Sequence, residues 1–167
     1  MAVSCTIHKR DGEVEVLRSA RPRVVTPPSI PTIAGLVSVA DIMTRDVICA
    51  LGDLPIDAVV DLLVNRHIGC VPVVDGEGCP VGMITKRDLV EWMVRRPSPA
   101  EPVPRTAEQA MLPLALTLDE RATVAVAAAL MAAEDVHHIP IVSPKGRIAG
   151  IVSSLDIVRW LARNDAR

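Results

Sequence analysis

The sequence predicts an α/β fold in which two similar units pack together as a pseudo-twofold pair. Residues 41–93 and 109–161 align without a gap at a constant offset of 68, and nine of the aligned pairs are identical. Such a regular internal repeat indicates two copies of one structural unit. Half of the 167 residues are hydrophobic, which is enough apolar material for a buried core in a chain of this length.

Residues 1–33 lie outside the repeat, and we expect an N-terminal appendage followed by a linker. The stretch from Ser4 to Arg18 has the pattern of a small hairpin that turns at Asp11 and Gly12. Prolines at positions 22, 27, 28 and 31 then predict an extended linker. The sequence indicates no role for this appendage.

Each repeat has the pattern of a β-α-β-β-α unit, and we place the units at 34–94 and 107–163. The expected order is a short extended segment, an apolar helix, two strands joined by a turn, and a closing helix. In the first unit these elements are 47–49, 55–66, 70–74, 81–84 and a helix from Thr85. In the second they are 115–117, 121–134, 138–142, 148–152 and a helix from Ser153. Residues 95–106 hold four prolines and form the predicted linker between the units.

The first helix of each unit has a candidate start signal and an unusual apolar surface. Pro55 suits a first-turn position, and Asp119 is a candidate N-cap. Both helices are apolar around much of their circumference, which indicates burial on more than one side. Either the sister repeat or a second copy of the chain could supply the second surface, and we expect self-association as a homodimer.

A short motif, Gly-x-x-Ser/Thr-x-x-Asp, stands where the last strand of each unit meets its closing helix. It comprises Gly82, Thr85 and Asp88 in the first unit, and Gly150, Ser153 and Asp156 in the second. An ionised Asp can accept hydrogen bonds from both hydroxyls of a ribose. The free amides of a helix's first turn favour a phosphate, and a glycine lets a flat base approach the strand closely. The motif therefore fits a nucleotide site.

The same motif also has a purely structural interpretation. Ser/Thr-x-x-Asp before an apolar helix is close to a capping box, with Thr85 and Ser153 as N-caps and the two Asp residues at the third helical position. Duplication does not decide between the interpretations, because a duplicated helix also duplicates its cap. The two roles can coexist, since a ligand can recruit a capping residue.

Taken together, the motifs resemble the CBS domain, the cystathionine β-synthase type. The resemblance rests on 68–75 followed by 82–89, on 136–142 followed by 150–157, and on the opening residues 40–44. It covers about residues 36–163, and its specificity lies in the order, spacing and duplication of the motifs. The resemblance implies a CBS pair, or Bateman module, in which two packed sheets leave two clefts. Such pairs commonly associate as flat, disc-like dimers.

The resemblance also implies a ligand of the adenosine type: AMP, ADP, ATP, S-adenosylmethionine, and in some cases NAD or a dinucleotide. It assigns the ribose to Thr85, Asp88, Ser153 and Asp156. The residues before the strand prolines, together with early strand residues, are then expected to line the base pocket. These are Gly69, Cys70, Val71, His137, His138, Ile139, Ile48 and Leu116.

The two motifs differ in charge. The first contains Lys86 and Arg87, which could both reach a phosphate, whereas the second has Ser154 and Leu155 at these positions. We therefore expect the first site to prefer the more phosphorylated ligand.

Composition argues against several other classes of function. With two Trp and no Phe or Tyr, base stacking on aromatic side chains is nearly unavailable. The net charge of -2, without a long basic run, gives no electrostatic footprint for a nucleic acid. No apolar run reaches membrane-spanning length, and the first residues lack the hydrophobic stretch of a signal peptide. Four cysteines without a CxxC pairing fit reduced thiols, so we expect a cytoplasmic protein.

The remaining polar residues offer weaker alternatives. His137, His138 and Cys70 lack the ligand number and spacing of a zinc site, so we expect no metal. A Cys-His nucleophilic pair would need a third, orienting group, and none is evident. The sequence has no P-loop and no clear carboxylate cluster, so we expect neither an enzymatic activity nor a required cofactor.

These observations predict a stand-alone, non-catalytic regulatory module. It would bind an adenosine nucleotide between its two repeats and signal to a partner protein in trans by population shift. The alternative is a dimeric interaction or scaffold module whose clefts are empty or vestigial. Neither the identity of the ligand nor that of the regulated partner follows from the sequence.

Overall fold

The computed structural model describes residues 4–8, 14–18, 34–95, 104–113 and 116–164, which belong to two compact units, Met1–Pro31 and Thr32–Arg167. In the smaller unit, strands β1 (Ser4–His8) and β2 (Val14–Arg18) pair antiparallel. The strands of the predicted hairpin are thus confirmed, while its turn and the linker that follows lie outside the described residues.

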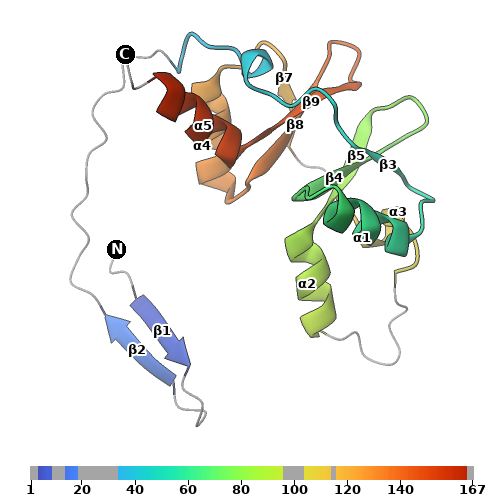
Figure 1. The fold of residues 1–167 in the computed structure, drawn as a ribbon, viewed down its shortest axis with the longest axis vertical. Helices are drawn as coiled ribbons and strands as arrows, with labels where there is room; N and C mark the ends of the chain where they lie inside the picture. Colours follow the sequence, from blue (N-terminus) through green and yellow to red (C-terminus); the bar gives the residue numbers. More distant parts are fainter. Residues whose placement is uncertain (1–3, 9–13, 19–33, 96–103, 114–115, 165–167) are drawn as a thin grey trace. The chain divides into compact units, whose positions relative to one another are not determined.

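Two mixed sheets form the framework of the larger unit (Figure 1). The first has the strand order β3-β4-β5-β6 and the second has the order β7-β8-β9. In each sheet the first pairing is parallel and the next is antiparallel. The first sheet consists of β3 (Ala50–Leu51), β4 (Cys70–Val74), β5 (Pro80–Thr85) and β6 (Leu112–Pro113). The second consists of β7 (Leu118–Asp119), β8 (His138–Val142) and β9 (Ile148–Ser153).

Two helices accompany the main strands of each sheet. In the first repeat, α1 (Ile56–Asn65) contacts β4 and α2 (Lys86–Arg95) contacts β5. In the second, α4 (Val124–Glu134) contacts β8 and α5 (Ser154–Asn164) contacts β9. The β-α-β-β-α order predicted for each repeat is confirmed, although the opening strands β3 and β7 begin three residues later than expected. Among the described helices, none is long and apolar enough to cross a membrane.

The start of α4 differs from the sequence-based expectation. Thr123 is the N-cap, and its hydroxyl oxygen accepts a hydrogen bond from the amide of Val126 at 3.3 Å. Asp119 instead accepts from the amide of Arg121 at 2.8 Å, in the turn before the helix. The prediction was wrong because Asp and Thr both cap helices well, so two such residues close together leave the start ambiguous.

The segment at the start of each repeat packs into the core of the other repeat. Val39, in the short 3-10 helix η1 (Val39–Asp41), and Met43 are both buried with the side chains of the second sheet. In the same way α3 (Ala107–Ala110) brings Ala107 into the core of the first sheet, with Met111 packed beside it. Residues 39–44 and 107–113 are therefore called the exchanged segments. They join the two repeats, because each core includes side chains from the exchanged segment of the other repeat.

Candidate functional site

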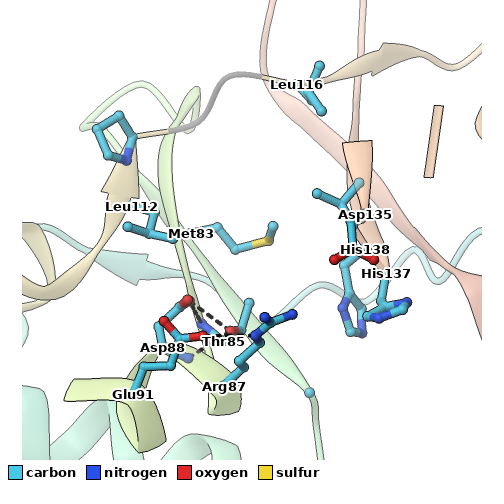
Figure 2. A pocket seen from close by; sticks show the side chains of 13 residues that line it. Met83, Thr85, Arg87, Asp88, Glu91, Leu112, Leu116, Asp135, His137 and His138 are labelled. Carbon is cyan, nitrogen blue, oxygen red and sulfur yellow. Dashed lines mark hydrogen bonds and ion pairs between the residues drawn. The ribbon is translucent and has the colours of Figure 1, made fainter. Parts of the chain in front are cut away.

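A cavity of about 460 Å³ opens beside the start of α2 (Figure 2). One wall comes from the first repeat: Gly69, the end of β5, and the first two turns of α2. Leu112, Pro113 and Leu116, together with residues 135–138 at the start of β8, complete the lining. The cavity is therefore shared between the repeats, and the exchanged segment supplies part of it.

Thr85 and Asp88 form a closed set of hydrogen bonds at the start of α2. Asp88 Oδ2 accepts from the Thr85 amide at 2.8 Å and from the Thr85 hydroxyl at 2.7 Å. Thr85 Oγ1 in turn accepts from the Asp88 amide at 3.2 Å. This is a capping box. Among the hydrogen bonds of the described residues Asp88 uses only Oδ2, so its Oδ1 is available to accept from a ligand, and both interpretations of the motif hold together.

Ser153 and Asp156 form the same set of bonds at the start of α5, at 2.8, 2.6 and 3.2 Å. Here, however, Asp156 Oδ1 also lies 3.9 Å from the Nη1 of Arg159. The equivalent residue in the first repeat is Glu91, whose Oε1 lies 2.9 Å from the Nε of Arg87. The two motifs thus share their geometry and differ in the charges beside the carboxylate.

Half of the residues predicted for the site come together around this cavity, and half do not. Those that line it are Gly69, Thr85, Arg87, Asp88, Leu116, His137 and His138. Those that are not among its lining residues are Ile48, Cys70, Val71, Lys86, Ile139, Ser153 and Asp156. His137 and His138, which belong to the second repeat, therefore lie beside the motif of the first repeat, because the start of β8 faces Gly69.

Three of the residues expected in the base pocket point into the protein core instead. Val71 and Ile139 are both 0% exposed and belong to the cores of the first and second sheets. Cys70 is also buried; burial, with a smaller contribution from Asp88, raises the pKa of its thiol to about 12. The thiol is therefore protonated at neutral pH, which argues against a thiolate nucleophile at this position. Among the described residues, no cluster of three or more His, Cys, Asp or Glu could hold a metal ion.

Six lining residues were not predicted: Met83, Glu91, Leu112, Pro113, Asp135 and Val136. Glu91 could have been found from helical spacing, since it lies three residues after Asp88 on the same face of α2. Asp135 and Val136 directly precede the predicted histidines. Leu112 and Pro113 of β6 line the cavity because they belong to an exchanged segment. No sequence pattern indicates that exchange.

His138 lies at the contact between the two repeats. A Cβ built on Gly69 would stand 3.0 Å from both the Cε1 and the Nε2 of His138, so the imidazole occupies the space that a side chain at position 69 would need. Burial lowers the pKa of His138, the neighbouring His137 lowers it further, and Asp156 opposes the shift. The imidazole is therefore uncharged at neutral pH.

We expect this lowered pKa to make folding less favourable in mild acid. The unfolded chain takes up a proton on His138 near the ordinary pKa of 6.5, whereas the folded chain resists it. Stability is therefore lost as the pH falls through 6.5 toward the folded pKa, and not above that interval. Urea denaturation between about pH 7.5 and 5.5 should show a smaller loss for His138→Gln than for the wild type. Equal losses would contradict this assignment.

Two stretches of the chain, residues 39–95 and 107–163, match the family model of the CBS domain. The chain belongs to the CBS domain family. The resemblance inferred from the motifs is thereby confirmed. The predicted fold, two CBS repeats packed as a CBS pair, is confirmed by solved structures of the family.

Among these is the CBS domain pair of protein MJ0100, in complex with 5′-methylthioadenosine and S-adenosyl-L-methionine. The two chains are 28% identical with a TM-score of 0.68, over 76% of this chain and 97% of that chain. A structure of CBSX2 in complex with AMP also has a TM-score of 0.68, at 20% identity, over 77% of this chain and 98% of that one. At that identity the second likeness concerns the fold alone.

The curated relatives are longer than the region they share with this chain. The MJ1404 protein of Methanocaldococcus jannaschii is 35% identical over an alignment of 135 residues, and the match covers 74% of this chain and 32% of that protein. The chain spans 32 to 62% of the first relatives that it matches. Several relatives are named as enzymes, and the chain spans no more than 24% of each. The shared part is therefore the CBS region, which occurs in chains of different kinds.

Proposed function

We propose that the chain is a non-catalytic regulatory module that binds an adenosine compound in the cavity beside α2. One observation carries the proposal. The cavity combines mostly apolar walls with the Asp88 carboxylate, which Thr85 holds in place and whose second oxygen is available. Small-molecule sites typically combine apolar walls with a few well-placed polar groups.

Each part of an adenosine has a matching part of the cavity in this proposal. Asp88 accepts hydrogen bonds from the ribose hydroxyls. Met83, Leu112 and Leu116 offer apolar surface to the base. Of the two cations predicted to contact a phosphate, Arg87 lines the cavity and Lys86 does not. The phosphate role of Lys86 and Arg87 stays a prediction. Ser153 and Asp156, in the same arrangement, are proposed as the ribose contacts of a second site.

The position of the cavity supports the proposed regulatory role. A ligand bound between Asp88 on one side and residues 135–138 on the other would contact both repeats. Its binding would favour one arrangement of the repeats over others. We propose that a partner protein, in the cytoplasm, reads this shift. The CBS pair crystallised with 5′-methylthioadenosine and S-adenosyl-L-methionine supports an adenosine-type ligand.

Exposed apolar side chains support the homodimer that we also propose. They lie on the closing helix of each repeat: Val90, Met93 and Val94 on α2, and Leu155, Val158 and Leu161 on α5. Such surface on a water-soluble unit favours a protein contact. The same observation favours the alternative function, a dimeric interaction module whose clefts are empty or vestigial.

A thermal-shift screen with AMP, ADP, ATP, S-adenosylmethionine and NAD separates these functions. A ligand that binds only the folded state at a hundred times its Kd adds about 2.7 kcal/mol to the free energy of unfolding. We expect stabilisation by at least one of the five compounds. Stabilisation by none would favour the interaction module. Chemical consumption of a bound compound, followed by chromatography, would contradict a non-catalytic role.

A further inference from the structure

The charges around the cavity indicate which class of adenosine compound it takes, and this inference rests on the proposed function. Among the described lining residues, Asp88, Glu91 and Asp135 carry carboxylates and Arg87 carries a guanidinium. Because Asp88 is used for the ribose, Glu91 and Asp135 set the charge that the 5′ end of the ligand meets. In Figure 2 they lie on opposite sides of the cavity, one on α2 and the other before β8.

Arg87 is already engaged by these carboxylates. Its Nε donates to Glu91 Oε1 at 2.9 Å. Both the hydrogen bond and the charge of Glu91 raise the pKa of the guanidinium, and Asp135 adds to the same effect. A phosphate that reached Arg87 would therefore have to compete with Glu91 and approach Asp135, two groups of its own sign.

The sister repeat has different charges at the equivalent positions. In the alignment of the two repeats, Arg159 is equivalent to Glu91, and His67 is equivalent to Asp135. His67 and Asp135 also share the same backbone geometry, with φ of 54° and 53° at the end of the preceding helix. The two carboxylates are therefore specific to this cavity, whereas the capping box and the strand geometry are common to both repeats.

We propose that the cavity selects adenosine compounds whose 5′ substituent is uncharged or cationic, a thioether or a sulfonium, over nucleoside polyphosphates. A sulfonium is attracted by Glu91 and Asp135, and the apolar part of such a substituent contacts Met83 and Val136. A polyphosphate meets repulsion from both carboxylates. At separations of a few ångströms in a high dielectric, each like charge lowers affinity about threefold to tenfold. The expectation that Lys86 and Arg87 favour a phosphorylated ligand makes the opposite prediction.

Calorimetry on the full chain tests this selection with S-adenosylmethionine, 5′-methylthioadenosine, AMP and ATP. We expect the two sulfur compounds to bind at least about tenfold more tightly than ATP. Raising the salt from about 20 to about 300 mM should weaken S-adenosylmethionine and leave uncharged 5′-methylthioadenosine unaffected. The Glu91→Gln/Asp135→Asn double variant should bind ATP about tenfold more tightly than the wild type, with 5′-methylthioadenosine as the reference for an intact site.

The outcomes separate this inference from the function on which it rests. Tighter binding of ATP than of 5′-methylthioadenosine would overturn the inference and leave the adenosine site standing. An unchanged ratio of ATP to 5′-methylthioadenosine affinity in the double variant would do the same. Failure of all four compounds, and of ADP and NAD in the thermal-shift screen, would instead refute the proposed function. If the double variant does not fold, the salt series on the wild type still decides.

Discussion

Asp88→Ala should lower the affinity of the α2 cavity for the proposed adenosine ligand about 10- to 100-fold. The variant removes the carboxylate that we propose accepts from the ribose, and hydrogen bonds to a charged group are worth about 1.5–3 kcal/mol each. Isothermal titration with the compound that gives the largest thermal shift measures the loss. Unchanged affinity would show that Asp88 serves only as a helix cap.

The same substitution should also destabilise the fold, because Asp88 Oδ2 accepts two hydrogen bonds from Thr85. Loss of a capping interaction typically costs about 1 kcal/mol. Asp88→Glu separates the two roles, because Glu is a usual partner at this position of a capping box. The longer side chain can keep the cap while displacing the second oxygen from the ribose. We therefore expect Asp88→Glu to keep its stability and lose ligand affinity.

Thr123→Ala supplies the matched control for the stability effect. It removes the hydrogen bond that caps α4, to the amide of Val126, without changing a residue that lines the cavity. Its free energy of unfolding should fall by about 1 kcal/mol, with ligand affinity unchanged. A similar loss of affinity in this control would mean that Asp88→Ala acts through general destabilisation.

The local parts of this structure could be predicted because local physics determines them. The strands around Pro72 and Pro140 are short apolar runs bounded by turns, and the helices after Thr85 and Ser153 start at their own caps. In these cases the residues that specify an element lie within it or beside it. The Gly-x-x-Ser/Thr-x-x-Asp motif could be found in the sequence for the same reason, since the hydrogen bonds of its capping box join residues three positions apart.

The non-local parts could not be predicted. Val39 and Ala107 stand at equivalent positions, 68 residues apart, at the start of the two repeats. Each is buried in the core of the other repeat. A repeat pattern shows that two units are alike and does not show which copy a connecting segment joins. For the same reason, the sequence does not show that His138, from the second repeat, lines the cavity with Asp88.

Gly82→Ala and Gly150→Ala should cause the largest losses of stability, because both glycines lie where the exchanged segments cross. A Cβ on Gly82 would contact the Sδ of Met111, with the Cγ of that residue at 2.7 Å and the backbone oxygen of Leu112 at 3.0 Å. At Gly150 it would contact the Sδ of Met43, with the Cγ at 2.8 Å and the backbone oxygen of Thr44 at 3.0 Å.

The expected cost is about 1–3 kcal/mol for each added methyl group, as for other overpacked cores. A methionine side chain can move aside in part, since it is flexible. The backbone oxygens cannot move without disturbing the pairing of the exchanged segments with the sheets. These pairings are Gly82–Pro113, between β5 and β6, and Thr44–Ile151, at the edge of β9. Urea denaturation should therefore show lower midpoints for both variants, while α2 and its capping box remain unchanged.

Gly76→Ala is the matched control, because a Cβ at that turn glycine would meet nothing within 4 Å. It should change the free energy of unfolding by no more than about 0.5 kcal/mol. Adding Met43→Ala to Gly150→Ala should recover part of the loss, and the two changes should be non-additive because the side chains touch. If Gly150→Ala is as stable as Gly76→Ala, the exchanged segment 39–44 is not tightly packed against β9. In that case the two repeats would be coupled less closely than a ligand-driven change in their arrangement requires.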